Sequence, residues 1–236
     1  MENRGLQISN LSSAHIESAP SLLLASQSPR RHQLLKLLGW TFGLASGEVN
    51  ENPRPGESPK SYVLRVAASK AQTVTHLDHM QVVVIAADTS VVYGGEIIGK
   101  PRDADEATHM LLRLRDREHE VYTGIALMQT DTGYMINDLC GTEVTMRDYT
   151  DDEIQKYVES GDFLDKAGGY AIQDTRFNPV RHLRGCYANV MGLPICHLVR
   201  NLVQWGYKPS VDVPKACQTT LDYPCPIFEE ILHQEI

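Results

Sequence analysis

The sequence lacks the features that mark membrane, secreted and disulfide-linked proteins. None of its 236 residues belongs to an apolar stretch of transmembrane length, and the first 20 residues contain no apolar run of the signal-peptide type. Its five cysteines include no C-x-x-C pair, and their odd number indicates reduced thiols. We therefore expect a cytoplasmic or nuclear protein that does not enter a membrane.

An excess of positive charge is also missing. The chain has 22 lysines and arginines against 30 aspartates and glutamates, which gives a formal net charge of -8, and it has no long basic run. This balance argues against a protein that binds nucleic acid. A polyanionic small molecule remains a suitable ligand if a few cations converge on one site and a metal ion assists them.

Several motifs of phosphate and hydrolase chemistry are absent. The chain contains neither G-x-x-x-x-G-K-[ST] nor G-x-G-x-x-G, so a phosphate site must be built without a P-loop or a Rossmann fingerprint. It has no H-x-x-x-H or H-E-x-x-H pair, which argues against a zinc site. No G-x-S-x-G surrounds Ser28, which argues against a serine hydrolase triad.

The stretch from Leu22 to Trp40 is the most informative part of the chain. A short apolar run predicts a buried strand, and Ser28-Pro29 supplies an N-cap and a first-turn proline for a following helix. A strand that turns into a helix directs free backbone N–H groups at one point, which suits phosphate. Arg30 and Arg31 add two cations where the helix dipole prefers acids. The pattern predicts an anion site, with surface arginines on an amphipathic helix as the alternative.

The remaining periodicities predict an α/β or α+β protein with a central mixed sheet flanked by helices. The segment 41–59 is predicted as a long loop. The β-branched run Gln81–Ala87 predicts a central strand that stops at Asp88, and a hairpin turns at Gly94-Gly95. Other predicted elements are helices at 60–76, after capping boxes at 103–106 and 150–153, and from Pro194, and strands at 120–129 and 134–146. The predicted divisions are a flexible lead (1–20), one domain (21–207) and a loosely attached tail (208–236).

A small set of polar residues could carry chemistry. Asp88 follows the apolar run directly, and a carboxylate there is costly unless it is paired, hydrogen-bonded or bound to metal. It is the first candidate for a general base or metal ligand, with a structural Asx-turn as the alternative. Thr89 beside it could cap the turn or bind a substrate. Weaker candidates on their own are Lys70, Lys100, Glu51 and Gln173, the last of which could read a base edge.

Together these stretches resemble one known family. The matching segments, in order, are LLLASQSPRRHQLLKLLG, GEVNE, YVLRVAASKA, VIAADTSVV with GEIIGKPRD, HEVYTGIAL, TEVTMRDYTDDEIQKYVESGDFLDKAGGYAIQ and ANVMGLPI. Over Leu22 to Tyr207 the chain is similar to the Maf family of nucleoside triphosphate pyrophosphatases, also found as the Maf-like part of a eukaryotic methyltransferase-like protein. The combination of SPRR, ADT, GKP and DKAG-x-Y-x-IQ at compatible spacing makes the resemblance specific.

The resemblance implies hydrolysis of a nucleoside triphosphate between its α- and β-phosphates, with Mg²⁺ or Mn²⁺ as the divalent cation. By position, Asp88 would accept the proton of the attacking water and, with Glu51, would help to bind the metal. The residues that would hold the triphosphate are Ser28, Arg30, Arg31, Lys70 and Lys100. The resemblance also implies an elongated fold with a twisted mixed sheet, a cleft between two lobes, and often a homodimer.

Three residues favour the branch of the family that acts on dTTP and UTP. Arg30, Thr89 and Gln173 are present here, whereas the branch that prefers 7-methyl-GTP typically lacks them. We expect Gln173 to pair with a pyrimidine edge. Two positions depart from the family: Asp174 replaces a usual glycine, which would add negative charge near the nucleotide, and Cys186 replaces a usual serine. The alternatives are a 7-methyl-GTP pyrophosphatase and a non-catalytic nucleotide-binding regulator of cell division.

Overall fold

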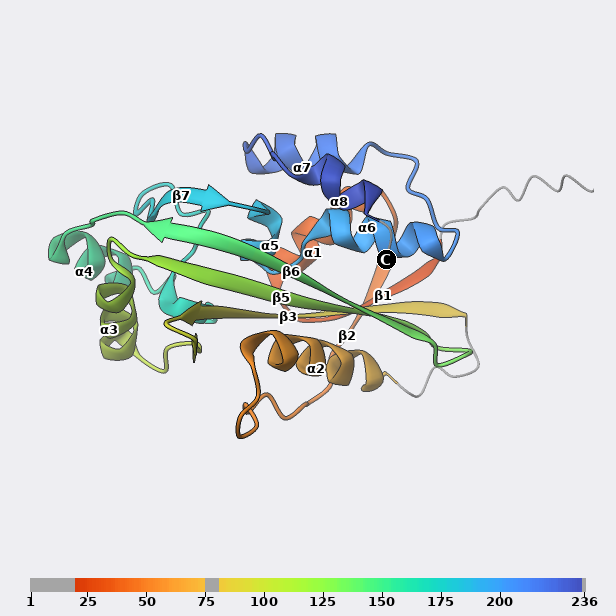
Figure 1. Cartoon of the computed structure of the whole chain (residues 1–236), viewed down its shortest axis with the longest axis horizontal. Helices are drawn as coiled ribbons and strands as arrows, with labels where there is room; N and C mark the ends of the chain where they lie inside the picture. The colour runs from red at the N-terminus through yellow and green to blue at the C-terminus, as the bar shows by residue number, and fades with distance from the viewer. Residues whose placement is uncertain (1–19, 75–80, 235–236) are drawn as a thin grey trace, which may run out of the picture.

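The computed structural model describes residues 20–74 and 81–234 (Figure 1). Residues 1–19 of the predicted lead and the predicted helix end at 75–76 lie outside these ranges. The strands are β1 (Ser21–Ala25), β2 (Phe42–Ala45), β3 (Val82–Tyr93), β4 (Glu96–Ile98), β5 (Glu118–Gln129), β6 (Met135–Met146) and β7 (Val180–Arg184). The helices are α1 (Pro29–Leu35), α2 (Pro59–Gln72), α3 (Ala104–Leu114), α4 (Asp151–Glu159), α5 (Tyr187–Met191), α6 (Ile195–Gln204), α7 (Val213–Leu221) and α8 (Phe228–His233), with short 3-10 helices η1 (Lys36–Leu38) and η3 (Ala167–Gly169).

One mixed sheet organises the molecule, as predicted. Its strand order is β2-β1-β3-β5-β6-β7, and β4 pairs with the far end of β3. β1 is parallel to both β2 and β3, whereas the pairs β3–β4, β3–β5, β5–β6 and β6–β7 are antiparallel. The β3–β4 hairpin turns at Gly94-Gly95, both of which have positive φ, so the predicted turn is confirmed.

Helices cover both faces of this sheet and divide one face into two lobes (Figure 1). On one face, small residues of α2 such as Ala67 and Ala71 pack against Ala86 of β3. On the other face, one apolar cluster lies beneath α1, α5 and α6, and a second lies beneath α3 and α4. One pocket is lined by residues of both clusters, such as Met191 of the first and Val91 of the second, in agreement with the cleft that the family resemblance implied.

Two sequence predictions about strands are wrong. The segment 41–59 is not all loop, because β2 extends the parallel edge through pairs such as Leu24↔Leu44. The central strand does not stop at Asp88 but continues to Tyr93, so this carboxylate lies in mid-strand. The strand continues because it stays paired with β5 as far as Val92↔Glu120. The ion pair of Asp88 with Lys70 offsets part of the cost of burying this charge.

The C-terminal segment is not loosely attached over its described part. Val213 of α7 and Ile231 of α8 are buried in the same cluster as α1 and α6, and each such side chain contributes about 2 kcal/mol. Arg200 of α6 fixes α8 further, since its Nη1 donates to the carbonyl of Ile231 at 3.3 Å. Among the described residues, no helix has the length and apolar character needed to cross a membrane.

The predicted helix starts are confirmed in different degrees. At α4 the capping box is complete, because Thr150 and Glu153 each accept the backbone N–H of the other. At α3, Asp103 caps the helix as predicted, but Glu106 accepts the backbone N–H of Arg102 rather than that of the cap. Ser28 caps α1, with Pro29 in the first turn.

Candidate active site

The candidate site lies where β3 has an open edge. The parallel partner β1 pairs with β3 as far as Leu24↔Ile85, and β4 begins to pair only at Val91↔Ile98. Within the described ranges, no strand pairs with this edge of β3 between these two points, whereas β5 pairs with its other edge throughout. A pocket with a volume of about 100 Å³ opens there. The predicted residues that line it are Ser28, Arg30, Arg31, Lys70, Asp88, Thr89, Lys100 and Gln173.

Asp88 and Thr89 serve opposite faces of the sheet because successive side chains alternate along a strand. Asp88, 6% exposed, faces α2, where Lys70 Nζ lies 2.7 Å from its Oδ1. The same Nζ lies 2.7 Å from Oε1 of Glu51. The fold therefore brings the three predicted charged residues together. Lys70, which the resemblance assigns to the triphosphate, is paired here with the two carboxylates.

Glu51 reaches this position because α2 holds its loop. Tyr62 Oη donates to the carbonyl of Glu51 at 2.7 Å, and Arg65 Nη2 donates to the carbonyl of Asn52 at 3.1 Å. Partial burial raises the pKa of Glu51, but the hydrogen bond from Lys70 and the charges of Lys70, Lys100 and Arg31 outweigh this effect. The net pKa is below the ordinary value, so Glu51 is ionised at neutral pH. It lines an adjoining pocket that is continuous with the first through shared residues such as Lys70.

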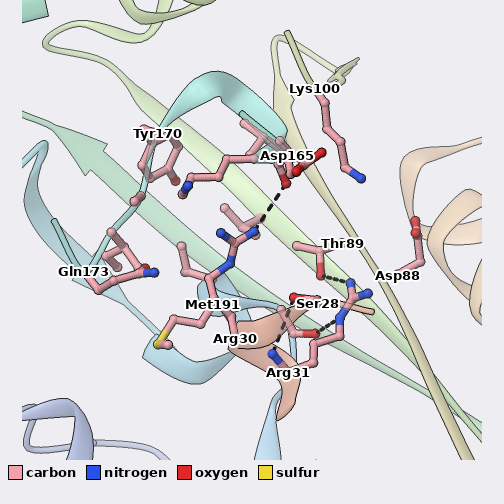
Figure 2. A pocket seen from close by; sticks show the side chains of 18 of the residues that line it. Ser28, Arg30, Arg31, Asp88, Thr89, Lys100, Asp165, Tyr170, Gln173 and Met191 are labelled. Carbon is pink, nitrogen blue, oxygen red and sulfur yellow. Dashed lines mark hydrogen bonds between the residues drawn. The ribbon is translucent and has the colours of Figure 1, made fainter. Parts of the chain in front are cut away.

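Arg31 is fixed by three oxygen acceptors, of which Thr89 is labelled in Figure 2. Its Nε donates to the carbonyl of Gly192 at 2.8 Å, Nη2 to Thr89 Oγ1 at 3.2 Å and Nη1 to Ser26 Oγ at 3.4 Å. Arg30 turns the other way and donates to the carbonyl of Asp165 at 3.3 Å. Burial lowers the pKa of each guanidinium. Both side chains remain cations because the ordinary pKa of arginine is very high. The two arginines thus contact opposite sides of the pocket, Arg31 at Gly192 and Arg30 at Asp165.

A buried chain of hydrogen bonds behind Thr89 was missed in the sequence. Thr89 Oγ1 lies 2.9 Å from Thr123 Oγ1, and Thr123 donates to the carbonyl of Asn189 at 3.1 Å. The Asn189 amide donates in turn to Thr142 Oγ1 and to the carbonyl of Val121, each at 2.9 Å. This network ties α5 to the sheet and orients the acceptor of Arg31. No local sequence pattern predicts this network, because its residues come from distant parts of the chain.

The segment Asp165–Gln173 forms the opposite wall of the pocket. Its glycines allow the close approach predicted for them: Gly168 has φ of 72°, and its N–H donates to the carbonyl of Gly99 at 2.9 Å. That bond brings the segment beside Lys100, which extends into the pocket in Figure 2. Gln173 is exposed at the other end of the pocket, so its amide can meet a ligand.

The two departures from the family have structural roles. Asp174 does not line the main pocket, and its Oδ1 accepts the backbone N–H groups of Arg176 and Phe177, each at 2.8 Å. Its charge therefore stabilises a turn, and its effect on a bound nucleotide stays a prediction. Cys186 is the buried residue before α5, and its backbone N–H donates to Thr142 Oγ1 at 3.1 Å.

His119 contacts a residue that lines the pocket and makes the stability of the fold depend on pH. Its Nε2 lies 2.8 Å from Oη of Tyr170, which lines the pocket, and burial lowers the pKa of His119 to about 4. The unfolded chain therefore binds a proton more readily than the folded one. Stability falls as the pH drops from about 6.5 toward 4, and His119 alone should account for about 2 kcal/mol between pH 7 and pH 5.

This expectation is tested by urea unfolding of His119→Gln at pH 7 and pH 5. The variant should lose about 2 kcal/mol less than the wild type over this interval. His182→Gln, at an exposed position on β7, is the matched control and should follow the wild type. Equal pH dependence of the wild type and His119→Gln would contradict the assignment.

The sequence of this chain matches a known protein family. A family model described as "Maf-like protein" matches residues 21–205. The chain belongs to the Maf-like family. A dTTP/UTP pyrophosphatase of Dehalococcoides mccartyi is 41% identical to this Maf-like protein over 192 residues, which are 81% of this chain and 85% of that relative. A protein of the same name from Anaeromyxobacter dehalogenans is 44% identical over 191 residues, or 80% and 96% of the two chains.

Solved structures add only a partial likeness. A Nucleoside-triphosphatase / dITP/XTP pyrophosphatase from Mycobacterium abscessus aligns with a TM-score of 0.36 and 18% sequence identity. The alignment covers 55% of this Maf-like protein and 75% of that chain. The family assignment therefore comes from the sequence, and it confirms the resemblance of the motifs SPRR, ADT and GKP.

Proposed function

We propose that this protein hydrolyses pyrimidine nucleoside triphosphates of the dTTP and UTP type to the nucleoside monophosphate and pyrophosphate. One observation carries the proposal: four predicted cations and a buried carboxylate meet in one pocket of a chain 41% and 44% identical to dTTP/UTP pyrophosphatases. Arg30, Arg31, Lys70 and Lys100 complement a polyphosphate in charge. Asp88 is the group that accepts a proton.

Each residue has a distinct part in this proposal. Asp88 uses Oδ1 to accept from Lys70, which leaves Oδ2 to orient a water molecule and take its proton. Arg31, fixed by three acceptors, offers a charge that does not need to reorganise during the reaction. Lys100 and Arg30 stabilise the negative charge that develops on the leaving pyrophosphate. Ser28 and Thr89 add hydroxyl groups beside these cations.

We further propose Mg²⁺ or Mn²⁺ as cofactor, held by Glu51 and Asp88. Carboxylate oxygens suit these ions, and both side chains lie 2.7 Å from the single Nζ of Lys70. Among the described residues, no cluster of three or more His, Cys, Asp or Glu side chains could hold a metal ion. Phosphate and water oxygens would complete the coordination, as is usual for Mg²⁺. When bound, the ion would neutralise charge on the phosphates.

Product analysis across a nucleotide panel tests the proposed reaction. Pyrophosphate and phosphate release should be measured on dTTP, UTP, dCTP, GTP and 7-methyl-GTP, with Mg²⁺ and with Mn²⁺. We expect pyrophosphate as the product and the highest kcat/KM for dTTP or UTP. Preference for 7-methyl-GTP would support the other branch of the family instead. Binding of nucleotides without turnover would support the regulator.

Gln173→Ala tests recognition of the base. We expect the preference for dTTP over GTP in kcat/KM to fall by about tenfold, because an unpaired pyrimidine edge loses its discriminating hydrogen bonds. Gln33→Ala is the control, since Gln33 is exposed on α1 and does not line the pocket. An unchanged base preference in Gln173→Ala would rule out this role.

We also propose that the protein works in the cytoplasm on free nucleotides, as a homodimer and without nucleic acid or a membrane surface. All five cysteines are free, which suits a reducing compartment, and the net charge of -8 disfavours long polyanions. Light scattering in solution tests the dimer, which predicts twice the mass of the chain.

A further inference from the structure

Lys70 occupies an unusual position for a residue that should bind phosphate. Its Nζ lies 2.7 Å from Glu51 Oε1 and 2.7 Å from Asp88 Oδ1, the two groups assigned to a divalent cation. The Lys70 side chain is 16% exposed and that of Asp88 is 9% exposed, so water screens this contact weakly. The ammonium thus pairs with the two carboxylates that would hold a metal ion.

The surrounding charges oppose the entry of a free cation. Lys100 and Arg31 act electrostatically on Glu51, as Lys70 does. These five groups, Glu51, Asp88, Lys70, Lys100 and Arg31, carry three positive charges and two negative ones. A bare dication is therefore repelled by the group as a whole. A triphosphate that carries one divalent cation remains an anion, and the same group attracts it.

We propose that Lys70 closes the divalent-cation site until a nucleotide arrives, so that the cation enters only as its triphosphate complex. Lys70 then exchanges its two carboxylate partners for phosphate oxygens. This proposal rests on the proposed function, because it concerns the order in which the same site is filled. It assigns to one side chain two successive roles, first as a counter-ion for the carboxylates and then as a phosphate ligand.

The test measures binding of Mn²⁺ to the full chain by electron paramagnetic resonance at pH 7.5. The wild type should bind Mn²⁺ alone weakly, and α,β-methylene-dUTP, which cannot be hydrolysed at that bond, should raise the affinity about tenfold or more. Lys70→Met should bind Mn²⁺ alone about tenfold more tightly than the wild type, because the competing ammonium is gone. Lys70→Gln serves if the methionine variant does not fold.

Two further variants make this result specific. Lys36→Met removes an exposed lysine of η1 and should leave Mn²⁺ binding as in the wild type. The double variant Lys70→Met, Glu51→Gln should lose the gain, because one of the two carboxylates is no longer charged. Equal affinity for Mn²⁺ alone in the wild type and Lys70→Met would overturn the proposal. So would a wild type that binds Mn²⁺ equally well with and without the nucleotide analogue.

The measurement separates this proposal from the proposed function, since it requires no turnover. If the wild type releases pyrophosphate but Lys70→Met gains no affinity for Mn²⁺, only the proposed role of Lys70 is overturned. The predicted Mn²⁺ pattern in a protein that hydrolyses none of the nucleotides supports the role of Lys70 and overturns the hydrolase.

Discussion

Replacing Asp88 with asparagine should lower kcat for dTTP by about 10³-fold, within the range for loss of a general base. The amide cannot take a proton from water, but its oxygen can still accept the hydrogen bond that Lys70 makes at 2.7 Å. The fold should therefore persist. Steady-state pyrophosphate release gives kcat and KM, and thermal unfolding checks the fold.

Asp138→Asn is the matched control for this prediction. Asp138 is another largely buried carboxylate paired with a cation, since its Oδ2 lies 2.7 Å from Arg200 Nη2. It does not line the pocket. This variant should lose stability and keep its kcat. A kcat for Asp88→Asn within tenfold of the wild type would contradict the role of Asp88 as general base.

Replacing Gly124 with alanine should destabilise the protein by about 3 kcal/mol, the upper range for overpacking a core. Gly124 is the cross-strand partner of Asp88, and the backbone of α2 crosses directly over it. A Cβ there would lie 2.5 Å from the carbonyl oxygen of Val63, and backbone atoms cannot turn aside as a side chain can. The helix must move away from the sheet, and because it carries Lys70, kcat should fall as well.

Gly99→Ala is the control for Gly124→Ala. A Cβ at Gly99 would meet nothing within 4 Å, so its free energy of unfolding should remain within about 0.5 kcal/mol of the wild type. Urea unfolding of the two variants gives the comparison directly. Equal stability of both would show that the close packing of α2 on β5 does not set the position of Lys70.

Local patterns in the sequence predicted the parts of the site that depend on neighbouring residues. Ser28 caps α1 and Thr150 forms a complete capping box, because both motifs are closed within a single helical turn. The arginines after Ser28 were recognised because they contradict the helix dipole, and Asp88 because it follows an apolar run. Ser28, Arg30, Arg31 and Asp88 all line the pocket.

Contacts between distant segments could not be predicted in this way. β3 continues past Asp88 because it stays paired with β5 as far as Val92↔Glu120, and the cation that pairs with Asp88 is Lys70, 18 residues earlier on a different element. The buried amide of Asn189 depends on Thr142, 47 residues away. The C-terminal helices were missed because their segment contains prolines and has only weak apolar periodicity. The packing of this segment is visible only in the fold, where Ile231 is buried in the core. Each failure concerns the partner of a residue, which only the fold supplies.

Hydrolysis of dTTP in water labelled with oxygen-18 tests the central claim most directly. If Asp88 directs water to the α-phosphorus, mass spectrometry should find the label in the nucleoside monophosphate and none in the pyrophosphate. Label in pyrophosphate, or release of labelled inorganic phosphate, would place the attack at another phosphorus and contradict the account.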